Sequence, residues 1–230
     1  MLRKLALGYV AAAILGAGSA CAAQAPVKIG FITTLSTPAG YIGEDARDAF
    51  NLAIKDGKLG GVPVDVVVED DGLKPGSGKQ SADKMLQEGI KLFTGINFSN
   101  VLTAVAPTVL QHGAFYVSTN PGPSPFAGAK CNKNYFVASF ENTQMHAAAG
   151  VAVDQLGYKN VALVAPNYQA GREALQGFKR TYTGKVDAEI YTKLDQSDFS
   201  VELARLRELA PAAIYEFEPG GAGINFAKQY

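Results

Sequence analysis

The chain has 230 residues, of which 47% are apolar and 18% are charged, a balance typical of a folded globular protein and not of a disordered chain. Lys and Arg together number 21, as do Asp and Glu, so the formal net charge of zero gives no electrostatic reason to bind nucleic acid. With two histidines and two cysteines, the composition also leaves little material for a metal site.

Residues 1–25 have the pattern of a cleaved secretory signal peptide. Two basic residues precede an apolar stretch at 5–20, and small residues around Cys21 provide a cleavage site. A membrane anchor is disfavoured because the stretch falls short of the ~18–20 apolar residues that span a bilayer. Lipid attachment at Cys21 is a further alternative, although the expected large aliphatic residue is missing. We therefore predict a periplasmic protein. If Cys21 leaves with the signal peptide, Cys131 remains as an odd cysteine, whose partner lies on chain beyond this sequence or which is a buried thiol.

After residue 26, strand patterns alternate with helix patterns. Val62–Glu69 is a nearly continuous valine run, as expected for a parallel strand buried on both faces. Asn142 is a candidate helix cap, as are Asp198 and Ser200. Strands are predicted at 27–33, 62–69, 91–96, 114–118, 135–139, 160–165, 186–191 and 212–217, and helices at 40–55, 81–88, 99–110, 142–156, 171–182, 198–209 and from 220 onward.

This alternation predicts an α/β fold with parallel sheets covered by helices on both sides. A loop rich in Pro and Gly at 119–130 divides the strands and helices into two runs. We therefore predict two α/β lobes that meet near Ser139 to Asn142, one at 26–140 and the other at 141–230.

Two glycine-rich segments resemble nucleotide-binding motifs and fail on spacing. Pro75–Lys79 lacks the Gly and the Ser/Thr that a phosphate loop needs, so a turn before a helix is expected. Gly221–Phe226 ends in Phe where a dinucleotide fingerprint has its third Gly. No cofactor is predicted.

Other candidate catalytic or metal-binding groups are also weak. His112 and His146 have no metal-ligand spacing between them, and His146 is expected to pack in a helix or to be exposed. The Asp70–Asp71 pair could bind a cation, but a structural or exposed role is favoured. We therefore predict a protein that is not an enzyme.

Polar, mostly uncharged side chains follow the strands of the first lobe. Ligands of open α/β sheets bind beyond the carboxyl ends of the strands, so these loops are the expected site. Ser99 opens a helix, where free N–H groups and the helix dipole favour an anion such as a carboxylate; as an alternative, Ser99 is only a cap. The predicted ligand-binding residues of this lobe are Tyr41, Asn97, Ser99, Asn100, Asn120 and Gly122.

The second lobe offers two more candidates in loops after strands. Tyr168 could stack on a ligand and close the cleft, or it could be an exposed loop residue. Glu218 could meet a ligand ammonium, although a solvated position is favoured.

Several segments, taken in order, resemble the leucine/isoleucine/valine-binding protein family, the exported solute-binding subunits of ABC importers. The resemblance covers essentially all of residues 27–230. It rests on the order and spacing of Val27–Gly30, Gly40–Gly43, Gly95 with Ser99–Asn100, Asn120–Pro125, Asn167–Gly171, Asp198–Leu203 and Pro219–Gly221.

The resemblance implies two lobes that trap a ligand as they close. It also implies that Ser99 and the backbone of Asn120 to Gly122 hold a carboxylate, and that a stacking tyrosine falls at Tyr41 or Ile42. The family's second-lobe tyrosine falls on Ala170, with Tyr168 displaced by two positions, which puts an amino-acid ligand in doubt.

The family normally continues well past Tyr230. The resemblance therefore suggests a partial product, which would expose apolar sheet faces and favour aggregation. We expect a monomeric solute-binding subunit that delivers a small carboxylate, either a branched-chain amino acid or an aromatic or aliphatic acid, to a membrane permease. The alternatives are an exported sensor module of the same fold, which a neighbouring kinase gene would indicate, and a nucleotide-using α/β enzyme.

Overall fold

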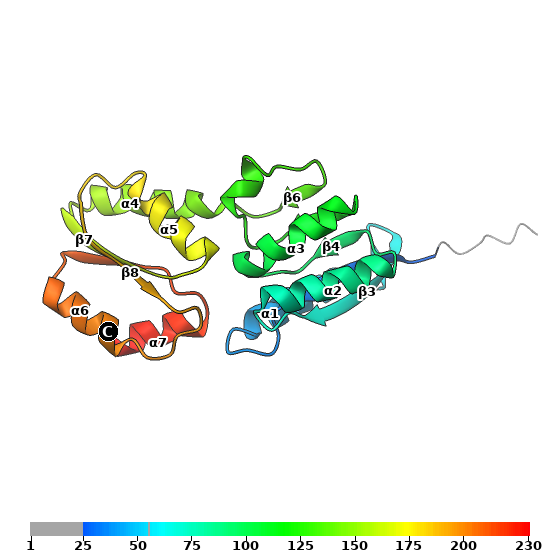
Figure 1. Ribbon diagram of the computed structural model, residues 1–230, viewed down its shortest axis with the longest axis horizontal. Coiled ribbons are helices and arrows are strands. Elements are labelled where there is room, and N and C mark those ends of the chain that lie inside the picture. The colour runs from blue at the N-terminus through cyan, green and yellow to red at the C-terminus, as the bar shows by residue number, and fades with distance from the viewer. Residues whose placement is uncertain (1–24, 55) are drawn as a thin grey trace, which may run out of the picture.

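The computed structural model describes residues 25–54 and 56–230. The predicted signal peptide and Cys21 lie outside the described residues. Two β-sheets lie end to end along the long axis of the molecule, each with its own helices (Figure 1). The first sheet contains the strands up to residue 137, and the second contains the strands that follow.

The sheet of the first lobe has six strands in the order β2-β3-β1-β4-β5-β6. Neighbouring strands are parallel except for the two-residue β2, which pairs antiparallel with β3 and which sequence analysis did not predict. The strands are β1 (Val27–Thr33), β2 (Lys58–Leu59), β3 (Val62–Asp70), β4 (Leu92–Thr94), β5 (Phe115–Ser118) and β6 (Tyr135–Val137).

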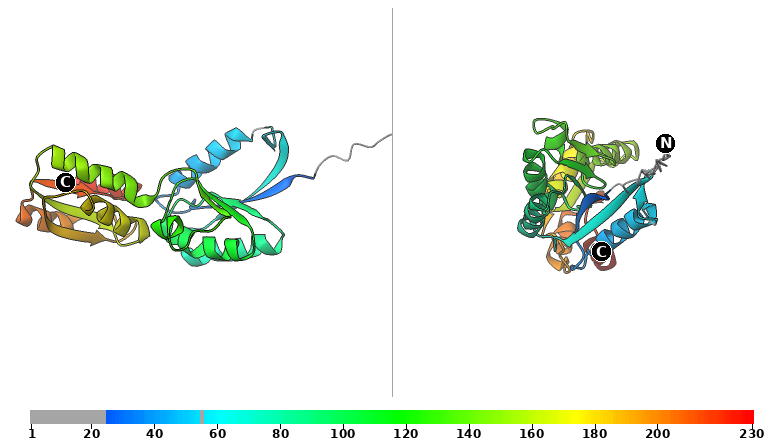
Figure 2. Two further views of the ribbon diagram at one scale, coloured as in Figure 1. Left: turned by 90° about the horizontal axis from the view of Figure 1, so that it is seen from above. Right: turned by 90° about the vertical axis from the view of Figure 1, so that its right-hand side faces the viewer.

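Helices cover the two faces of this sheet unequally. Helices α2 (Pro75–Gln87) and α3 (Ser99–Gln111) pack over one face, whereas α1 (Tyr41–Ala53) alone lies on the other (Figure 2). The main core of the lobe lies under α2 and α3 and includes Ile32, Phe93 and Tyr116.

The face that carries α1 remains partly open. Phe31 packs there against Phe50 of α1, with 5.3 Å between ring centroids. Further along the sheet, Phe115 and Val117 are exposed together with their cross-strand neighbours Leu92 and Phe136.

The prediction that the valine run is buried on both faces is wrong. Every residue of strand β3 is intermediate or exposed, and none is buried. It lies next to the short edge strand β2. Strand β3 therefore lies close to the edge of the sheet and has few neighbours on its outer side. A run of β-branched residues does not by itself distinguish a strand near the edge from a central strand.

The sheet of the second lobe has three parallel strands in the order β8-β7-β9. Alternate residues of β7 (Asn160–Pro166) enter two separate cores, because successive strand residues point to opposite faces. Helices α4 (Asn142–Gln155) and α5 (Gln169–Lys179) cover one face, and α6 (Ser200–Leu209) and α7 (Gly221–Gln229) cover the other (Figure 1). The remaining strands are β8 (Lys185–Thr192) and β9 (Ala213–Glu216).

The starts or caps of helices α2, α4 and α6 differ from the sequence predictions. Helix α2 begins at Pro75, where a turn was expected. Proline suits the first helical position, because the N–H that it lacks would have no partner there. Helix α4 is capped by Glu141, which forms a capping box with Gln144, so Asn142 is its first helical residue. Helix α6 has Phe199 at the cap position, while the carboxylate of Asp198 accepts the N–H of Ser200.

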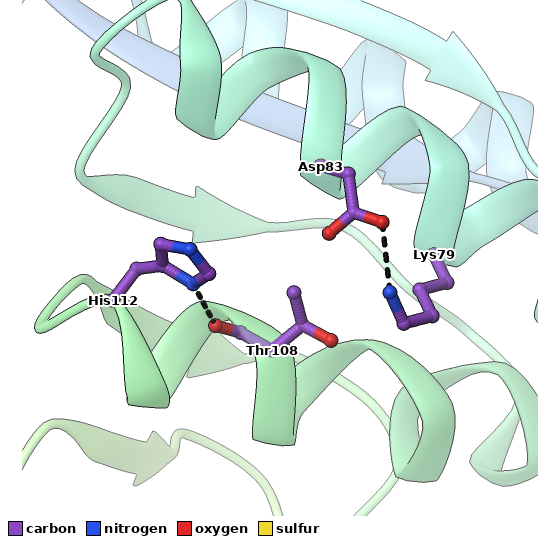
Figure 3. A network of polar contacts seen from close by, with 4 residues as sticks. All are labelled: Lys79, Asp83, Thr108 and His112. Carbon is purple, nitrogen blue, oxygen red and sulfur yellow. Dashed lines mark hydrogen bonds and ion pairs between the residues drawn. The ribbon is translucent and has the colours of Figure 1, made fainter.

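Polar groups on α2 and α3 have local structural roles (Figure 3). Lys79 and Asp83 form an ion pair one turn apart on α2. At the end of α3, the Nδ1–H of His112 donates to the carbonyl of Thr108 at 2.8 Å. The backbone N–H of His112 also donates to this carbonyl at 3.4 Å, so the imidazole adds a second donor at the C-terminal end of α3.

Candidate functional site

A cavity of about 180 Å³ lies between the two lobes. The first lobe lines it with the loops that follow β4 and β5, and the second lobe with α4 and the loops that follow β7 and β9. None of its lining side chains carries a full charge at neutral pH. The lining residues are Ile42, Asn97, Phe98, Ser99, Asn120, Pro121, Phe140, Asn142, Met145, His146, Tyr168, Ala170, Phe217 and Pro219.

The loop after β4 brings three lining residues to the cavity through a tight turn. Gly95 has φ +101°, a conformation that side chains rarely adopt. A Cβ at this position would lie 2.8 Å from the carbonyl oxygen of Ile32. This glycine therefore allows the chain to turn directly into the start of α3 at Ser99.

The first turn of α3 provides hydrogen-bond donors at the cavity. The cap residue, Phe98, has no side-chain acceptor. Within the described part of the chain, no partner is recorded for the N–H groups of Ser99 and Asn100. The Oγ of Ser99 accepts a bond from Asn142 Nδ2 at 3.1 Å, so its own proton remains available to donate.

Asparagine side chains fix the loops around this helix start. Asn97 donates to Thr33 Oγ1 at 2.8 Å, and Asn120 donates to the carbonyl of Asn97 at 3.0 Å. The two loops of the first lobe are thus tied to each other and to the end of β1.

Glu173 of α5 joins the two lobes behind the cavity. One carboxylate oxygen accepts from the N–H and the hydroxyl of Ser124 and from Gln169 Nε2, and the other accepts from Asn142 Nδ2 at 2.7 Å. The amide oxygen of Asn142 accepts the N–H of Gly122 at 2.9 Å. A side chain that is 2% exposed therefore has four donors, which compensate its charge.

Tyr168 forms an aromatic wall across the lobe boundary. The side chain is buried within the core of the first lobe, and its ring centroid lies 6.5 Å from that of Phe98. Burial, followed by the nearby Glu218 and Glu173 carboxylates, raises the pKa of its phenol, which stays protonated at neutral pH. The two lobes are therefore in direct contact around the cavity.

His146 lines the cavity from the second turn of α4. Its Nδ1 lies 2.5 Å from the hydroxyl of Tyr215, and its ring packs edge-on against Phe217 with 4.8 Å between centroids. Burial lowers its pKa, against an opposing effect of Glu141 and Glu173, so the imidazole is neutral at neutral pH.

The expectation that Glu218 is solvated is wrong, because the side chain is only 7% exposed. One oxygen accepts from Thr192 Oγ1 at 2.5 Å, and the other is buried without a recorded partner among the described residues. Burial raises the pKa of the carboxyl to about 7.

Four of the seven predicted ligand residues line the cavity: Asn97, Ser99, Asn120 and Tyr168. Tyr41 is exposed, and it is Ile42 that borders the cavity. Asn100 lies beside the cavity with an N–H that has no recorded partner, and the N–H of Gly122 is used by Asn142.

Sequence reasoning missed Asn142, His146 and Glu173. The sequence pattern indicates Asn142 only as a helix cap, and no local motif points to Glu173. The signal for His146 was its position four residues after Asn142, which places both on one face of α4. Their partners are distant in the sequence, so no local pattern shows them.

The Asp70–Asp71 pair has a structural role. Asp71 accepts from Thr34 Oγ1 at 2.5 Å, and Asp70 accepts the N–H of Leu35 at 2.8 Å, so the acidic pair ties the ends of β1 and β3 together. Within the described ranges, no group of three potential metal ligands occurs.

A family model described as periplasmic binding protein matches residues 26–230. The chain belongs to this family. Its members are solute-binding proteins, and membership implies a periplasmic location. Curated relatives include Leu/Ile/Val-binding protein homolog 3 of Brucella melitensis, which is 24% identical over 206 residues, covering 86% of this chain and 56% of the relative.

Solved structures of high similarity are solute-binding proteins of ABC transporters from Rhodopseudomonas palustris. One in complex with benzoate has a TM-score of 0.85 and 29% identity, covering 89% of this chain and 59% of its own. Another, with 3,4-dihydroxybenzoic acid, has a TM-score of 0.82 and 26% identity, covering 89% and 57%.

These matches confirm the α/β class with parallel sheets and the family resemblance found in the sequence. The chain spans 56% of the first curated relative and 59% of the first solved structure. In the part that the structure describes, none of the helices is long and apolar enough to cross a membrane.

Proposed function

We propose that this protein captures a small aromatic carboxylate in the cavity between its lobes. The observation that carries the proposal is the start of α3, where the N–H and the hydroxyl of Ser99 border an otherwise uncharged cavity. Among the described residues, no partner is recorded for this N–H or for that of the adjacent Asn100. A helix N-terminus of this kind stabilises an anion through its donors and its dipole.

The size and lining of the cavity favour an aromatic ring. Its volume of about 180 Å³ is close to the ~150 Å³ of an apolar cavity that accommodates benzene. Phe98 and Tyr168 lie on opposite sides of the lobe boundary, and Phe140 and Phe217 complete the aromatic lining.

The lining argues against an α-amino acid. A bound ammonium group needs an acceptor of opposite charge, and among the residues that the structure describes no carboxylate lines the cavity. The benzoate complexes among the similar structures support the same choice, although the curated relatives carry the names of leucine, isoleucine and valine binders.

Tight binding requires both hydrogen bonds to the carboxylate and burial of the aromatic ring. Charge-assisted hydrogen bonds contribute about 1.5–3 kcal/mol each, and three of them give ~5–9 kcal/mol before the cost of association. Micromolar affinity needs about 8 kcal/mol. Burial of the ring between the two lobes supplies the difference, so neither lobe alone should bind tightly.

The wider role that we propose is delivery of the acid to the membrane permease of an ABC importer, without catalysis. The lobes at 26–140 and 141–230 would close on the ligand by a hinge near residue 140, as two-lobed binding proteins do. Export through a cleaved signal peptide at residues 1–25 and a monomeric state belong to the same proposal.

Calorimetric titration of benzoate into Ser99→Ala tests the proposal. We expect the variant to bind benzoate ~10–100-fold more weakly than the wild type, because it loses a charge-assisted bond of about 1.5–3 kcal/mol. Thr103→Ala is the matched control: Thr103 lies one turn further along α3, bonds to the carbonyl of Asn100 and does not border the cavity. Equal affinities of the two variants would contradict the proposal.

A further inference from the structure

His146 brings a hydrogen-bonding group to the otherwise apolar end of the cavity. The side chain is 3% exposed and borders the cavity. Its Nδ1 is engaged by the hydroxyl of Tyr215, whereas no partner is recorded for Nε2 among the described residues. Nε2 is not one of the fully buried polar atoms that lack a partner. Since His146 borders the cavity, we infer that Nε2 is accessible to a group inside it.

The contact with Tyr215 is compatible with an imidazole proton on Nε2, because the phenol can donate to Nδ1. Burial, followed by the nearby Glu216 carboxylate, raises the pKa of the Tyr215 phenol to about 12, so its hydroxyl is protonated at neutral pH. Nδ1 of His146 is the acceptor within reach of that hydroxyl. If the phenol donates to Nδ1, the neutral imidazole carries its proton on Nε2 and is a donor toward the cavity.

The position of this donor relative to the carboxylate site is set by α4. Asn142, which contacts the Ser99 hydroxyl at 3.1 Å, and His146 are four residues apart on one helical face. At a rise of ~1.5 Å per residue, they are about 6 Å apart along the axis. This is comparable to the length of a benzene ring between its carboxyl carbon and a substituent at position 4.

We propose that His146 determines specificity by donating from Nε2 to an oxygen substituent on the ligand, opposite its carboxylate. The inference rests on the proposed function and narrows the ligand to an aromatic acid that carries a hydroxyl or similar oxygen at that position. A ligand without this oxygen leaves a buried N–H unpaired, which is the condition under which a binding site discriminates strongly.

Paired ligands of similar size test the inference by calorimetry at pH 7.5. 4-Hydroxybenzoate offers an acceptor oxygen, and 4-methylbenzoate fills nearly the same volume without one. The wild type should bind the hydroxy acid at least ~10-fold more tightly. In His146→Phe, which keeps an aromatic ring against Phe217, the ratio should fall below ~3-fold with little change for the methyl acid.

Two further variants keep the test decisive if His146→Phe folds poorly. Tyr215→Phe removes the hydroxyl that orients the imidazole, does not border the cavity and should reduce the preference. His146→Gln retains a side-chain donor and should preserve part of it. A purely structural role of His146 would weaken both acids alike and leave their ratio unchanged.

The outcomes separate this inference from the proposed function. If the wild type binds both acids with equal affinity, or if His146→Phe keeps the full preference, the inference is overturned and carboxylate capture stands. If the wild type binds neither these acids nor benzoate, the proposed function fails, and the inference fails with it.

Discussion

Glu218 shows how burial changes one side chain. Its carboxyl has a pKa of about 7, raised by burial against the opposing hydrogen bond from Thr192 and further raised by Glu216 and Glu202. The folded state therefore binds the proton more tightly than the unfolded state, whose value is near 4.5. The contribution of Glu218 to stability is therefore fully present below pH 4.5, the pKa of the unfolded state. It is lost as the pH rises through the folded-state pKa of about 7.

We predict that Glu218→Gln is more stable than the wild type at pH 8 and that the difference shrinks toward pH 5. After allowance for partial solvation, the gain should be about 1 kcal/mol, or ~2–4 °C in Tm. Thermal melts of both proteins at several pH values measure it. Glu189→Gln, at a partly exposed position, is the comparison for the loss of a carboxylate charge. A Tm difference between Glu218→Gln and wild type that does not change with pH would refute the prediction.

The site residues were predictable only in part, for reasons visible at this scale. Asn97, Ser99 and Asn120 follow strands directly, so the rule that ligands bind beyond the carboxyl ends of strands located them. Glu218 also follows a strand, but its burial depends on α7 and on Thr192, which no local pattern reveals. The role proposed for His146 depends on Tyr215, 69 positions away along the chain.

At the scale of elements, α5 links the lobes through Glu173. Its four donors come from Ser124 in the first lobe, from Asn142 at the start of α4 and from Gln169 on its own helix. Helices α4 and α5 also pack closely, since a Cβ on Gly177 would lie 2.4 Å from the carbonyl oxygen of Thr143. The geometry around Asn142 therefore depends on this helix pair.

We predict that Glu173→Ala lowers the free energy of unfolding by about 3 kcal/mol or more, because it leaves buried donors without an acceptor. Urea denaturation measures this loss. Glu189→Ala is a suitable comparison: it removes a partly exposed ion pair with Lys179, and such pairs contribute ~0–1 kcal/mol. Similar small losses in both variants would show that the Glu173 network does not stabilise the fold.

Most strands and helices were predictable from the sequence, whereas their ends were less so. Hydrophobic periodicity located β1 and β7, since apolar side chains alternate or run continuously there. The start of α2 was missed because Gly76 and Gly78 suggested a turn, although Gly78 is buried and a Cβ there would lie 2.6 Å from Val101. Close helix packing, and not local propensity, explains that glycine.

At the scale of the whole molecule, one sheet face of the first lobe remains open. Phe136 is 51% exposed, and Leu92, Phe115 and Val117 continue the same apolar strip. Contiguous apolar surface of this kind favours association with other apolar surfaces. The binding cavity lies elsewhere, between the lobes, so this surface does not take part in the proposed ligand contacts.

The central claim is that an aromatic carboxylate lies between the lobes with its charge at the start of α3. A crystal structure of the protein with benzoate tests this claim most directly. We predict that the carboxylate oxygens accept from the N–H groups of Ser99 and Asn100 and from the Ser99 hydroxyl, with the ring in the cavity against the Phe98 and Tyr168 side chains. Benzoate bound at the opposite ends of the strands, or its carboxylate directed away from α3, would contradict the account.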